Sequence, residues 1–426
     1  MGTDKLKVVW ICHFSNEKVR NVLPLVKKAE KISDFAPWVT NLIQEFKKFK
    51  EVELHVISPH VGLKRFSCSF DIEGIHYHFF KADIPFLNRY WPRIFRLDAW
   101  TGFVWNRFLV RCFLDNIQPD IVNLLGAENP HYSATVLGIR HIPVLISIQG
   151  IYSNEERFKV EKRDVVRYKV ERKVHSENRY YGISAPFMSK LVRRDVTDPV
   201  LFWNRFPLKA MKFKNIKHIG KKYDFVFFSR MTPLKGTEDA LEALALVKRY
   251  KPDVTLRMMG YSDERYRAEL REKARKLGIE SNVAISGGFA FHEDLLSEAA
   301  KATNYLLPTK LDTIPGTIFE AICLGLPVVS YRTGDIPLLN KGDVRVLLCD
   351  RDDIASLADN MIRLLEEPAL GSELSQKAKD FVEKWFDNRM LSLNFVNQYN
   401  AVLAHFHHNE SVPDNLLYEN YFQALN

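Results

Sequence analysis

The chain has 426 residues, an apolar fraction of 46% and a formal net charge of +9 at neutral pH. This length predicts two or three domains, and the apolar fraction excludes a disordered protein. No stretch approaches the roughly 18 uninterrupted apolar residues of a membrane span, and the N-terminal apolar run is too short for a signal peptide. The basic surplus suits nucleic acid, anionic lipid or acidic substrates and does not choose among them. Five widely spaced cysteines without a C-x-x-C pair favour reduced, buried thiols in a cytosolic protein.

In the first half of the chain, continuous apolar runs alternate with segments of helical spacing. The runs predict buried strands at 5–12, 52–58, 119–126, 142–150, 179–184 and 199–204. The helical spacing predicts helices at 37–50 and 99–117. Such alternation is typical of parallel sheets covered by helices on both faces.

The same pattern restarts after a basic polar stretch at 207–222. Further strands are predicted at 223–230, 253–260, 281–286, 303–308, 326–331 and 344–349, with helices at 236–250 and 263–278. We therefore predict an α/β protein with two facing Rossmann-like domains and a cleft between them. The expected boundaries are 1–205 for the first domain, 206–387 for the second, and 388–426 for a C-terminal helix and tail.

The stretch "SRMTPLKG" (229–236) follows the first strand of the second half. Arg230 and Lys235 flank a loop that contains proline, and Gly236 opens a helix. Two cations beside free N–H groups at a helix start make an anion site. The alternative is two solvated surface cations at a strand-to-helix turn.

The stretch "LDTIPGTIFEAICLGLPVVS" (311–330) places Asp312 and Glu320 around a predicted helix start at Gly316 and Thr317. One interpretation is a capping box, in which Thr317 caps the helix and Glu320 binds a free backbone N–H. The other is a ligand site, in which a diphosphate binds the helix start while the two carboxylates accept hydrogen bonds from sugar and ribose hydroxyls.

Together these two stretches resemble the retaining nucleotide-sugar glycosyltransferases of family 4, which have the GT-B fold. Arg230 and Lys235 match the family's R-x(4)-K pair, and 312–329 matches its E-x(7)-E element and the "EA-x-x-x-G-x-PVV" that follows. The resemblance implies that 1–205 is an acceptor-binding domain, that 206–387 is a nucleotide-sugar-binding domain, and that the helix in 388–426 crosses back to the first domain. It also implies retention of configuration, no metal ion and no cofactor. It implies a catalytic role for Arg230, Lys235 and Asp312. It implies donor binding by Glu320, Gly316, Thr317, Ile318 and Gly260.

The chain departs from the family pattern in both halves. Asp312 stands where the family has glutamate, which shortens the first acid by one methylene. Gln149 stands where the family has a histidine in the first domain. His13 and His131 are the candidate substitutes, so the predicted acceptor-side residues are His13, Gln149 and His131.

Four other segments allow competing interpretations. "DRDD" (350–353) resembles a metal-binding motif, but the acids precede a helical pattern and are expected to cap it. "HFHH" (405–408) is expected to be a solvated helix end, so no metal site is predicted. The arginine-rich aromatic segment 86–111 suits a membrane interface or a helix packed on the sheet, and the basic helix at 157–173 suits a membrane or a solvated face.

These features predict a glycosyltransferase that moves a sugar from a nucleotide diphosphate sugar to a hydroxyl of a glycan or lipid-linked acceptor, in surface polysaccharide or glycoconjugate assembly. We expect a cytoplasmic protein, peripheral on the inner face of the membrane at an anionic lipid surface, with no nucleic-acid partner. The enzymatic alternative is a nucleotide-sugar 2-epimerase of the same fold. The non-enzymatic alternative is a basic nucleic-acid-binding protein, although two carboxylates beside the cations would repel a phosphate backbone.

Overall fold

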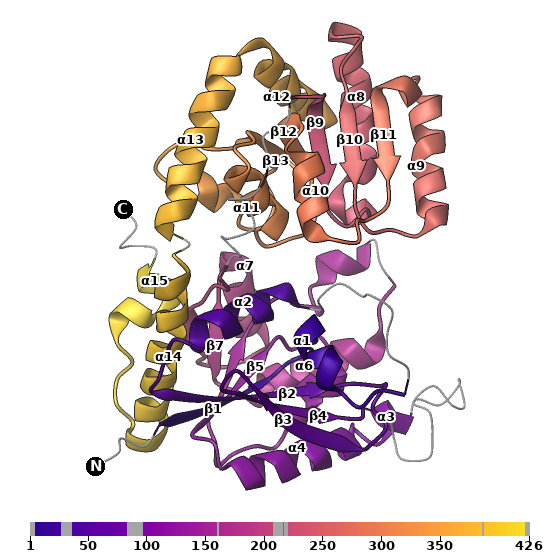
Figure 1. Ribbon diagram of the computed structural model, residues 1–426. Helices are drawn as coiled ribbons and strands as arrows, with labels where there is room; N and C mark the ends of the chain where they lie inside the picture. The colour runs from indigo at the N-terminus through magenta and orange to yellow at the C-terminus, as the bar shows by residue number, and fades with distance from the viewer. Residues whose placement is uncertain are drawn as a thin grey trace. The chain divides into compact units, whose positions relative to one another are not determined.

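The computed structural model describes residues 5–26, 36–82, 97–159, 162–207, 216, 220–385 and 387–421. The chain divides into two compact units (Figure 1). Unit 1 consists of 1–208 and 388–426, and unit 2 consists of 209–387. Each unit has one predominantly parallel sheet with helices packed around it, which confirms the predicted α/β class with two Rossmann-like halves.

The sheet of unit 1 has eight strands in the order β3-β4-β2-β1-β5-β6-β7-β8. The strands are β1 (Leu6–Ile11), β2 (Val52–Pro59), β3 (Ser67–Ile72), β4 (Ile75–Phe80), β5 (Ile121–Leu125), β6 (Val144–Ser147), β7 (Tyr180–Ile183) and β8 (Val200–Trp203). All neighbouring pairs are parallel except β3 and β4. The chain leaves β1 toward β2 on one side and later returns to β5 on the other, so the topological switch point lies between β1 and β5.

The helices of unit 1 include the last long helix of the chain. They are α1 (Glu17–Val22), α2 (Pro37–Phe46), α3 (Leu97–Trp100), α4 (Val104–Ile117), α5 (Pro130–Ser133), α6 (Val165–Ser176), α7 (Pro186–Asp195), α14 (Asn388–His408) and α15 (Tyr418–Tyr421). In α14 the Tyr399 hydroxyl accepts from Trp10 Nε1 at 2.9 Å and from Asn123 Nδ2 at 2.7 Å. These bonds connect α14 to β1 and β5 inside an aromatic core, where an unpaired hydroxyl would be costly.

The sheet of unit 2 has six strands in the order β11-β10-β9-β12-β13-β14, and all neighbouring pairs are parallel. The strands are β9 (Tyr223–Phe228), β10 (Leu256–Met259), β11 (Val283–Ser286), β12 (Ala302–Leu307), β13 (Val328–Tyr331) and β14 (Leu347–Cys349). The helices are α8 (Thr237–Tyr250), α9 (Glu264–Lys276), α10 (His292–Ala299), α11 (Gly316–Cys323), α12 (Ile354–Glu366) and α13 (Pro368–Trp385). Here the switch point lies between β9 and β12.

Every strand predicted from the sequence is present, and most are shorter at their ends by a few residues. The hairpin of β3 and β4 was missed. Its two-residue turn, Glu73 and Gly74, has positive φ at both positions, the conformation that joins antiparallel strands with the correct twist. The helix predicted at 99–117 is broken where Gly102 and Phe103 adopt left-handed φ values of 62° and 58°.

All five cysteines are free. Cys12 and Cys349 are buried as expected, whereas Cys112 is exposed on α4, contrary to the expectation of buried thiols. No helix among the described residues has the length and apolarity needed to cross a membrane.

Candidate functional site

The predicted catalytic residues of unit 2 lie in the loops at the carboxyl ends of β9 and β12. β9 pairs with β10 on one side and with β12 on the other. Arg230 and Lys235 follow β9, and Asp312 follows β12. Ligands of open parallel sheets bind beyond the carboxyl ends of the strands at the switch point. The fold therefore brings these three residues to the position where a ligand is expected.

Lys235 and Asp312 form an ion pair between Nζ and Oδ2. The other carboxylate oxygen of Asp312 accepts from the Thr313 N–H at 3.0 Å. Both charged side chains are largely buried, with exposed fractions of 22% and 17%. Arg230 is exposed and has no ion pair or hydrogen bond to any residue that the structure describes. The site thus holds one cation already paired with a carboxylate and one cation open to solvent.

The start of α11 is open. Its N-cap is Pro315, which makes no side-chain cap, and a Cβ added at Gly316 would meet no atom within 4 Å. The Thr317 hydroxyl bonds to the buried Tyr305 hydroxyl at 2.8 Å instead of capping a backbone N–H. The capping-box interpretation is therefore wrong, because Thr317 lies inside the helix and not at its cap.

Glu320 lies one turn into α11. Its Oε1 is 2.7 Å from Nε2 of His292, the first residue of α10. Its Oε2 is buried and has no hydrogen-bond partner among the described residues. Sequence reasoning missed both His292 and Tyr305. No sequence motif marked His292, and Tyr305 lies in a predicted buried strand, where an aromatic residue is expected in the core.

Two glycines allow the loops to approach each other closely. A Cβ at Gly260, after β10, would lie 1.6 Å from the Ser229 carbonyl oxygen, and one at Gly334 would lie 2.0 Å from the Asp312 carbonyl oxygen. Gly334 also has a left-handed φ of 56°. Ile318 is fully buried and its N–H donates to the Pro315 carbonyl at 3.0 Å, so in this structure it packs α11 against the sheet.

The three acceptor-side candidates lie at different places in unit 1. His13 follows β1 and Gln149 follows β6, each partly buried at a carboxyl end of the sheet. His131 lies in α5, where its ring meets Phe103 edge to face at 5.5 Å between centroids and its Nδ1 is 3.9 Å from Asp98 Oδ2. These contacts give His131 a packing role.

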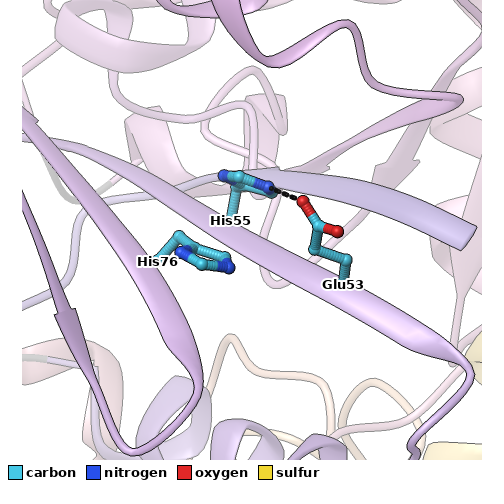
Figure 2. Close-up of side chains that lie close together, drawn as sticks. All are labelled: Glu53, His55 and His76. Atoms are coloured by element: carbon cyan, nitrogen blue, oxygen red, sulfur yellow. Dashed lines mark hydrogen bonds and ion pairs between the residues drawn. The ribbon is translucent and has the colours of Figure 1, made fainter. Parts of the chain in front are cut away.

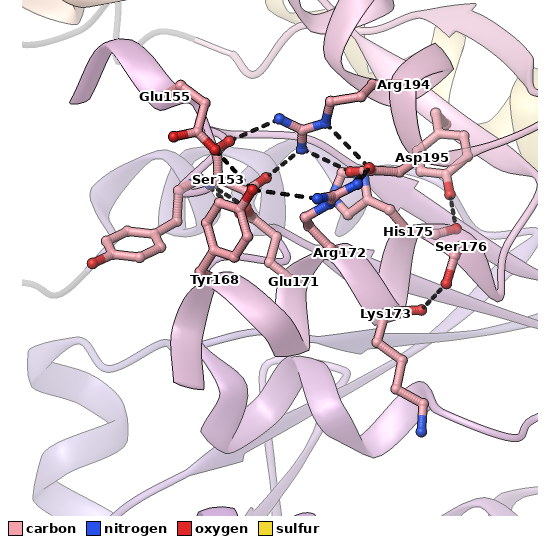
Figure 3. Close-up of polar contacts among 12 residues, drawn as sticks. Ser153, Glu155, Tyr168, Glu171, Arg172, Lys173, His175, Ser176, Arg194 and Asp195 are labelled. Carbon is pink, nitrogen blue, oxygen red and sulfur yellow. Dashed lines mark hydrogen bonds and ion pairs between the residues drawn. The ribbon is translucent and has the colours of Figure 1, made fainter. Parts of the chain in front are cut away.

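The loop after Gln149 is fixed by a polar cluster of α6 and α7 (Figure 3). The buried carboxylate of Glu171 accepts from the N–H groups of Tyr152 and Ser153 at 2.7 Å and 2.5 Å. Arg194 donates to the carbonyl and hydroxyl oxygens of Ser153, both at 2.9 Å, and also contacts Asp195. The loop is therefore preorganised by charge-assisted hydrogen bonds.

Glu128, which sequence reasoning missed, follows β5 on the other side of the switch point from His13. Its Oε2 is buried and has no hydrogen-bond partner within the described part of the chain. Burial raises the pKa of its carboxyl to about 7. The Glu128 carbonyl accepts from Arg167 Nε at 3.0 Å, and the Arg167 guanidinium lies 4.0 Å from the centre of the Tyr152 ring. Glu128 is thereby connected to the loop that carries Gln149.

The structure gives contacts for two of the motifs with competing interpretations, at 350–353 and 405–408. Asp353 caps α12 by accepting from the Ser356 N–H at 3.0 Å, as expected, and Asp352 pairs with Lys310 at 2.8 Å. The tract at 405–408 was expected to be solvated; His407 and His408 are exposed, whereas His405 is partly buried and bonds to the Tyr180 hydroxyl at 2.7 Å.

The basic, aromatic segment 86–111 falls partly outside the described residues, up to residue 96. In the described part, α4 packs on unit 1, and Arg107 and Arg111 both donate to the Leu137 carbonyl, at 3.2 Å and 2.8 Å. Trp100 and Phe108 remain exposed. In the segment 157–173, α6 packs into unit 1 through Glu171, and Arg167 contacts Tyr152. Most of these described basic side chains therefore make contacts with other residues of unit 1.

Two predominantly parallel sheets, one in each unit, form the two-domain architecture of the GT-B class. Among solved structures, sucrose-phosphate synthase from Thermosynechococcus elongatus matches with a TM-score of 0.69 at 14% identity, covering 94% of this chain and 100% of that one. Anabaena Alr3699/HepE, in complex with UDP and glucose, matches with a TM-score of 0.60 at 15% identity, covering 93% and 100%. At these identities the likeness concerns the fold alone.

Residues 209–381 match the family model "Glycosyl transferases group 1". The amylovoran biosynthesis glycosyltransferase AmsK of Erwinia amylovora is 29% identical over 147 residues, covering 33% of this chain and 35% of that relative. The match thus spans about a third of the relative's length. The family model thus covers most of unit 2, and the structural neighbours show a fold of the GT-B class.

Proposed function

We propose that this protein is a retaining glycosyltransferase of family 4 that transfers a sugar from a nucleotide diphosphate sugar to an acceptor hydroxyl. The observation that carries the proposal is the juxtaposition of Lys235 and Asp312 at the switch point of unit 2, beside the open start of α11. The sugar and the diphosphate of the donor share one bridging oxygen. A cation for the phosphate and a carboxylate for the sugar must therefore be neighbours, as Lys235 and Asp312 are.

In the proposed mechanism, Arg230 and Lys235 neutralise the charge that develops on the departing diphosphate. The backbone N–H groups at Gly316 and Thr317 add to this stabilisation, because a helix start favours an anion. Asp312 accepts hydrogen bonds from sugar hydroxyls, and Glu320 accepts through its unpartnered Oε2 from the ribose. Catalysis then rests on positioned charges and on the alignment of the reacting groups.

We place the acceptor at the switch point of unit 1, near His13, Gln149 and Glu128. A buried carboxylate oxygen without a partner is costly unless a ligand donates to it. An acceptor hydroxyl that donates to Glu128 Oε2 would remove that cost. A glycan or a lipid-linked glycan offers such hydroxyls, and AmsK is named for a polysaccharide pathway. We therefore favour an acceptor from surface polysaccharide or glycoconjugate assembly.

The test begins with a thermal-shift screen of UDP, GDP and ADP and their sugars. One nucleotide should raise the unfolding temperature, and its sugar should be consumed only when an acceptor is added. Consumption with release of an epimer and no acceptor would instead establish the 2-epimerase alternative. Retention is tested by the anomeric coupling of the product in NMR, and metal independence by turnover in the presence of a chelator. No observation at the site favours the nucleic-acid-binding alternative.

We also propose peripheral attachment of unit 1 to an anionic membrane on the cytoplasmic side. The supporting observation is a group of exposed apolar side chains: Trp100 at the end of α3, Val104 and Phe108 in α4, and Phe66. Val104 and Phe108 are four residues apart in one helix, so they lie on the same side of α4. Co-sedimentation with vesicles of anionic lipid should show binding that weakens with salt and falls for Trp100→Ala. Equal pelleting of the variant would contradict the placement.

A further inference from the structure

A cluster of histidines and carboxylates lies on one face of the unit 1 sheet, on strands β2 and β4 (Figure 2). Glu53 and His55 are two residues apart on β2, so their side chains point to the same face. His76 of β4 is the register partner of His55, and their rings stack with centroids 4.5 Å apart. One nitrogen of each ring faces the Glu53 carboxylate (Figure 2). Nothing in the proposed glycosyl transfer uses these residues.

Three ligand atoms of this cluster, one each from Glu53, His55 and His76, lie within 4.8 Å of one another. A tetrahedral ion with bonds near 2.0–2.1 Å requires donor separations of about 3.3 Å. Glu53 Oε1 and His55 Nε2 are already 3.0 Å apart. Small side-chain rotations of Glu53 and His76, both partly exposed, would therefore complete the geometry.

The outer hydrogen bonds orient both rings toward such an ion. His76 donates from Nδ1 to Asp71 Oδ1 at 2.6 Å, which leaves the lone pair of its Nε2 free. His55 Nδ1 is 3.0 Å from His78 Nε2, and His78 Nδ1 is 2.8 Å from Ser69 Oγ. The donors and acceptors in this series of hydrogen bonds can exchange roles. His55 then donates from Nδ1 and releases the Nε2 proton when an ion binds. A carboxylate or imidazole behind each ligating histidine is the arrangement that orients metal ligands.

The charge state of the cluster also suits a cation. Glu53 brings a carboxylate that accepts from His55 Nε2 at 3.0 Å. The 3.0 Å contact between His55 Nδ1 and His78 Nε2 needs one unprotonated nitrogen as acceptor, so at least one of these two rings is neutral. Lys7 is the nearby cation that acts on both Glu53 and His55, and a divalent ion must compete with it.

We propose that Glu53, His55 and His76 bind one divalent transition-metal ion of the zinc type and thereby fasten β4, with its hairpin partner β3, to β2. Two imidazoles and one carboxylate form a ligand set that zinc accepts, with a fourth position left for water. The hard cations calcium and magnesium are disfavoured, because they prefer sites made of oxygen alone. None of the three ligands is among the residues proposed to bind the donor or the acceptor, so the ion is not part of the proposed transfer chemistry.

The test is a calorimetric titration of the chelator-treated full chain with Zn²⁺, followed by the Co²⁺ absorption spectrum. We expect one saturable equivalent, tetrahedral Co²⁺ bands and a higher unfolding temperature with zinc. His76→Gln should weaken binding at least ~10-fold, because glutamine keeps a similar volume but removes the ligand nitrogen. Asp71→Asn, which touches no ion directly, should weaken binding by roughly 10- to 100-fold.

The matched control is the double variant His407→Gln, His408→Gln at the exposed end of α14, the other histidine-rich tract of the chain. This variant should bind Zn²⁺ as the wild type does. Loss of binding in the control, or unchanged affinity in His76→Gln, would overturn the proposal. So would the absence of any saturable equivalent. His76 is partly exposed, so its substitution should leave the fold intact, which circular dichroism checks.

Discussion

The two units carry different kinds of residues in the loops at the switch points of their sheets. In unit 2 the loops at the switch point carry charged residues that are partly exposed or ion-paired, Arg230, Lys235 and Asp312. In unit 1 the equivalent loops, after β1 and β5, carry His13 and a carboxylate with a buried, unpartnered oxygen, Glu128. The proposed ligands account for this difference. A diphosphate requires fixed positive charge, whereas an acceptor hydroxyl requires one well-placed hydrogen-bond partner.

The difference also explains why only one of the units has a recognisable sequence pattern. In unit 2 a single strand-to-helix turn supplies both cations, so their spacing along the chain is fixed. In unit 1 the residues of the proposed acceptor site come from loops far apart in the sequence, and Arg167 of α6 connects two of them. Substitutions that separate the two units' roles test this comparison.

Among these substitutions, removing a cation of unit 2 should have the largest effect, which is on turnover. Lys235→Ala should lower turnover by ~10²–10³, because it removes a preorganised charge from the leaving group. Arg230→Ala should act in the same direction. Initial rates at saturating donor measure the effect. The control is Lys251→Ala, which breaks an ion pair with Asp224 at the opposite end of the sheet and should keep normal turnover. Normal turnover of Lys235→Ala would remove Lys235 from the mechanism.

His175, a buried histidine of unit 1, should make the stability of the protein sensitive to acid. Burial lowers the pKa of His175 to about 4, from an ordinary value of 6.5 in the unfolded chain. In this pH range the unfolded chain binds a proton at His175 and the folded chain does not. The free energy of unfolding therefore falls as the pH drops from about 6.5 toward 4. Between pH 7 and pH 5 this amounts to about 2 kcal/mol, since one pKa unit corresponds to ~1.4 kcal/mol.

His175→Leu should therefore show a smaller drop in melting temperature from pH 7 to pH 5, by about 4–8 °C for a unit of this size. Exposed His141→Gln is the control and should melt with the wild-type pH dependence. A wild-type pH dependence in His175→Leu would mean that the ring is protonated in the folded protein.

A smaller effect is expected for Glu320 in unit 2. Glu320→Gln can keep the contact with His292 but loses the charge that strengthens hydrogen bonds to Oε2. We expect nucleotide diphosphate affinity to fall roughly 5- to 30-fold, or about 1–2 kcal/mol. Calorimetry measures it, with Asp312→Asn affecting the intact nucleotide sugar more than the free nucleotide. Unchanged affinity in Glu320→Gln would show that Glu320 serves only to hold His292.

The smallest effect is expected for Glu128 in unit 1. Its charged carboxylate should bind the acceptor more tightly than the neutral form, so acceptor affinity should rise as the pH increases through about 7. Glu128→Gln should raise the acceptor KM about 10-fold and remove this pH dependence, with donor binding unchanged. Exposed Glu177→Gln is the control. A change in donor affinity instead would show that Glu128 belongs to the donor site. The two units would then not differ in the proposed way.

Local sequence determined much of this protein. The continuous apolar runs identified every strand of unit 2, because a strand buried on both faces needs no polar alternation. The hairpin of β3 and β4 was missed, although its Glu73-Gly74 turn lies between alternating residues. The spacing of Arg230, Lys235, Asp312 and Glu320 predicted a donor site, and in the structure these residues follow two strands that lie side by side.

Only the tertiary structure decided which polar residues meet. Periodicity reports which face of an element is buried, and it does not identify the partner. His292 reaches Glu320 from another helix, and Thr317 bonds to a core tyrosine instead of capping its helix. Glu128 has one oxygen that is buried without a partner among the described residues, and His55 meets His76 because parallel register pairs β2 with β4. Such contacts depend on strand order and loop packing, which no local pattern encodes.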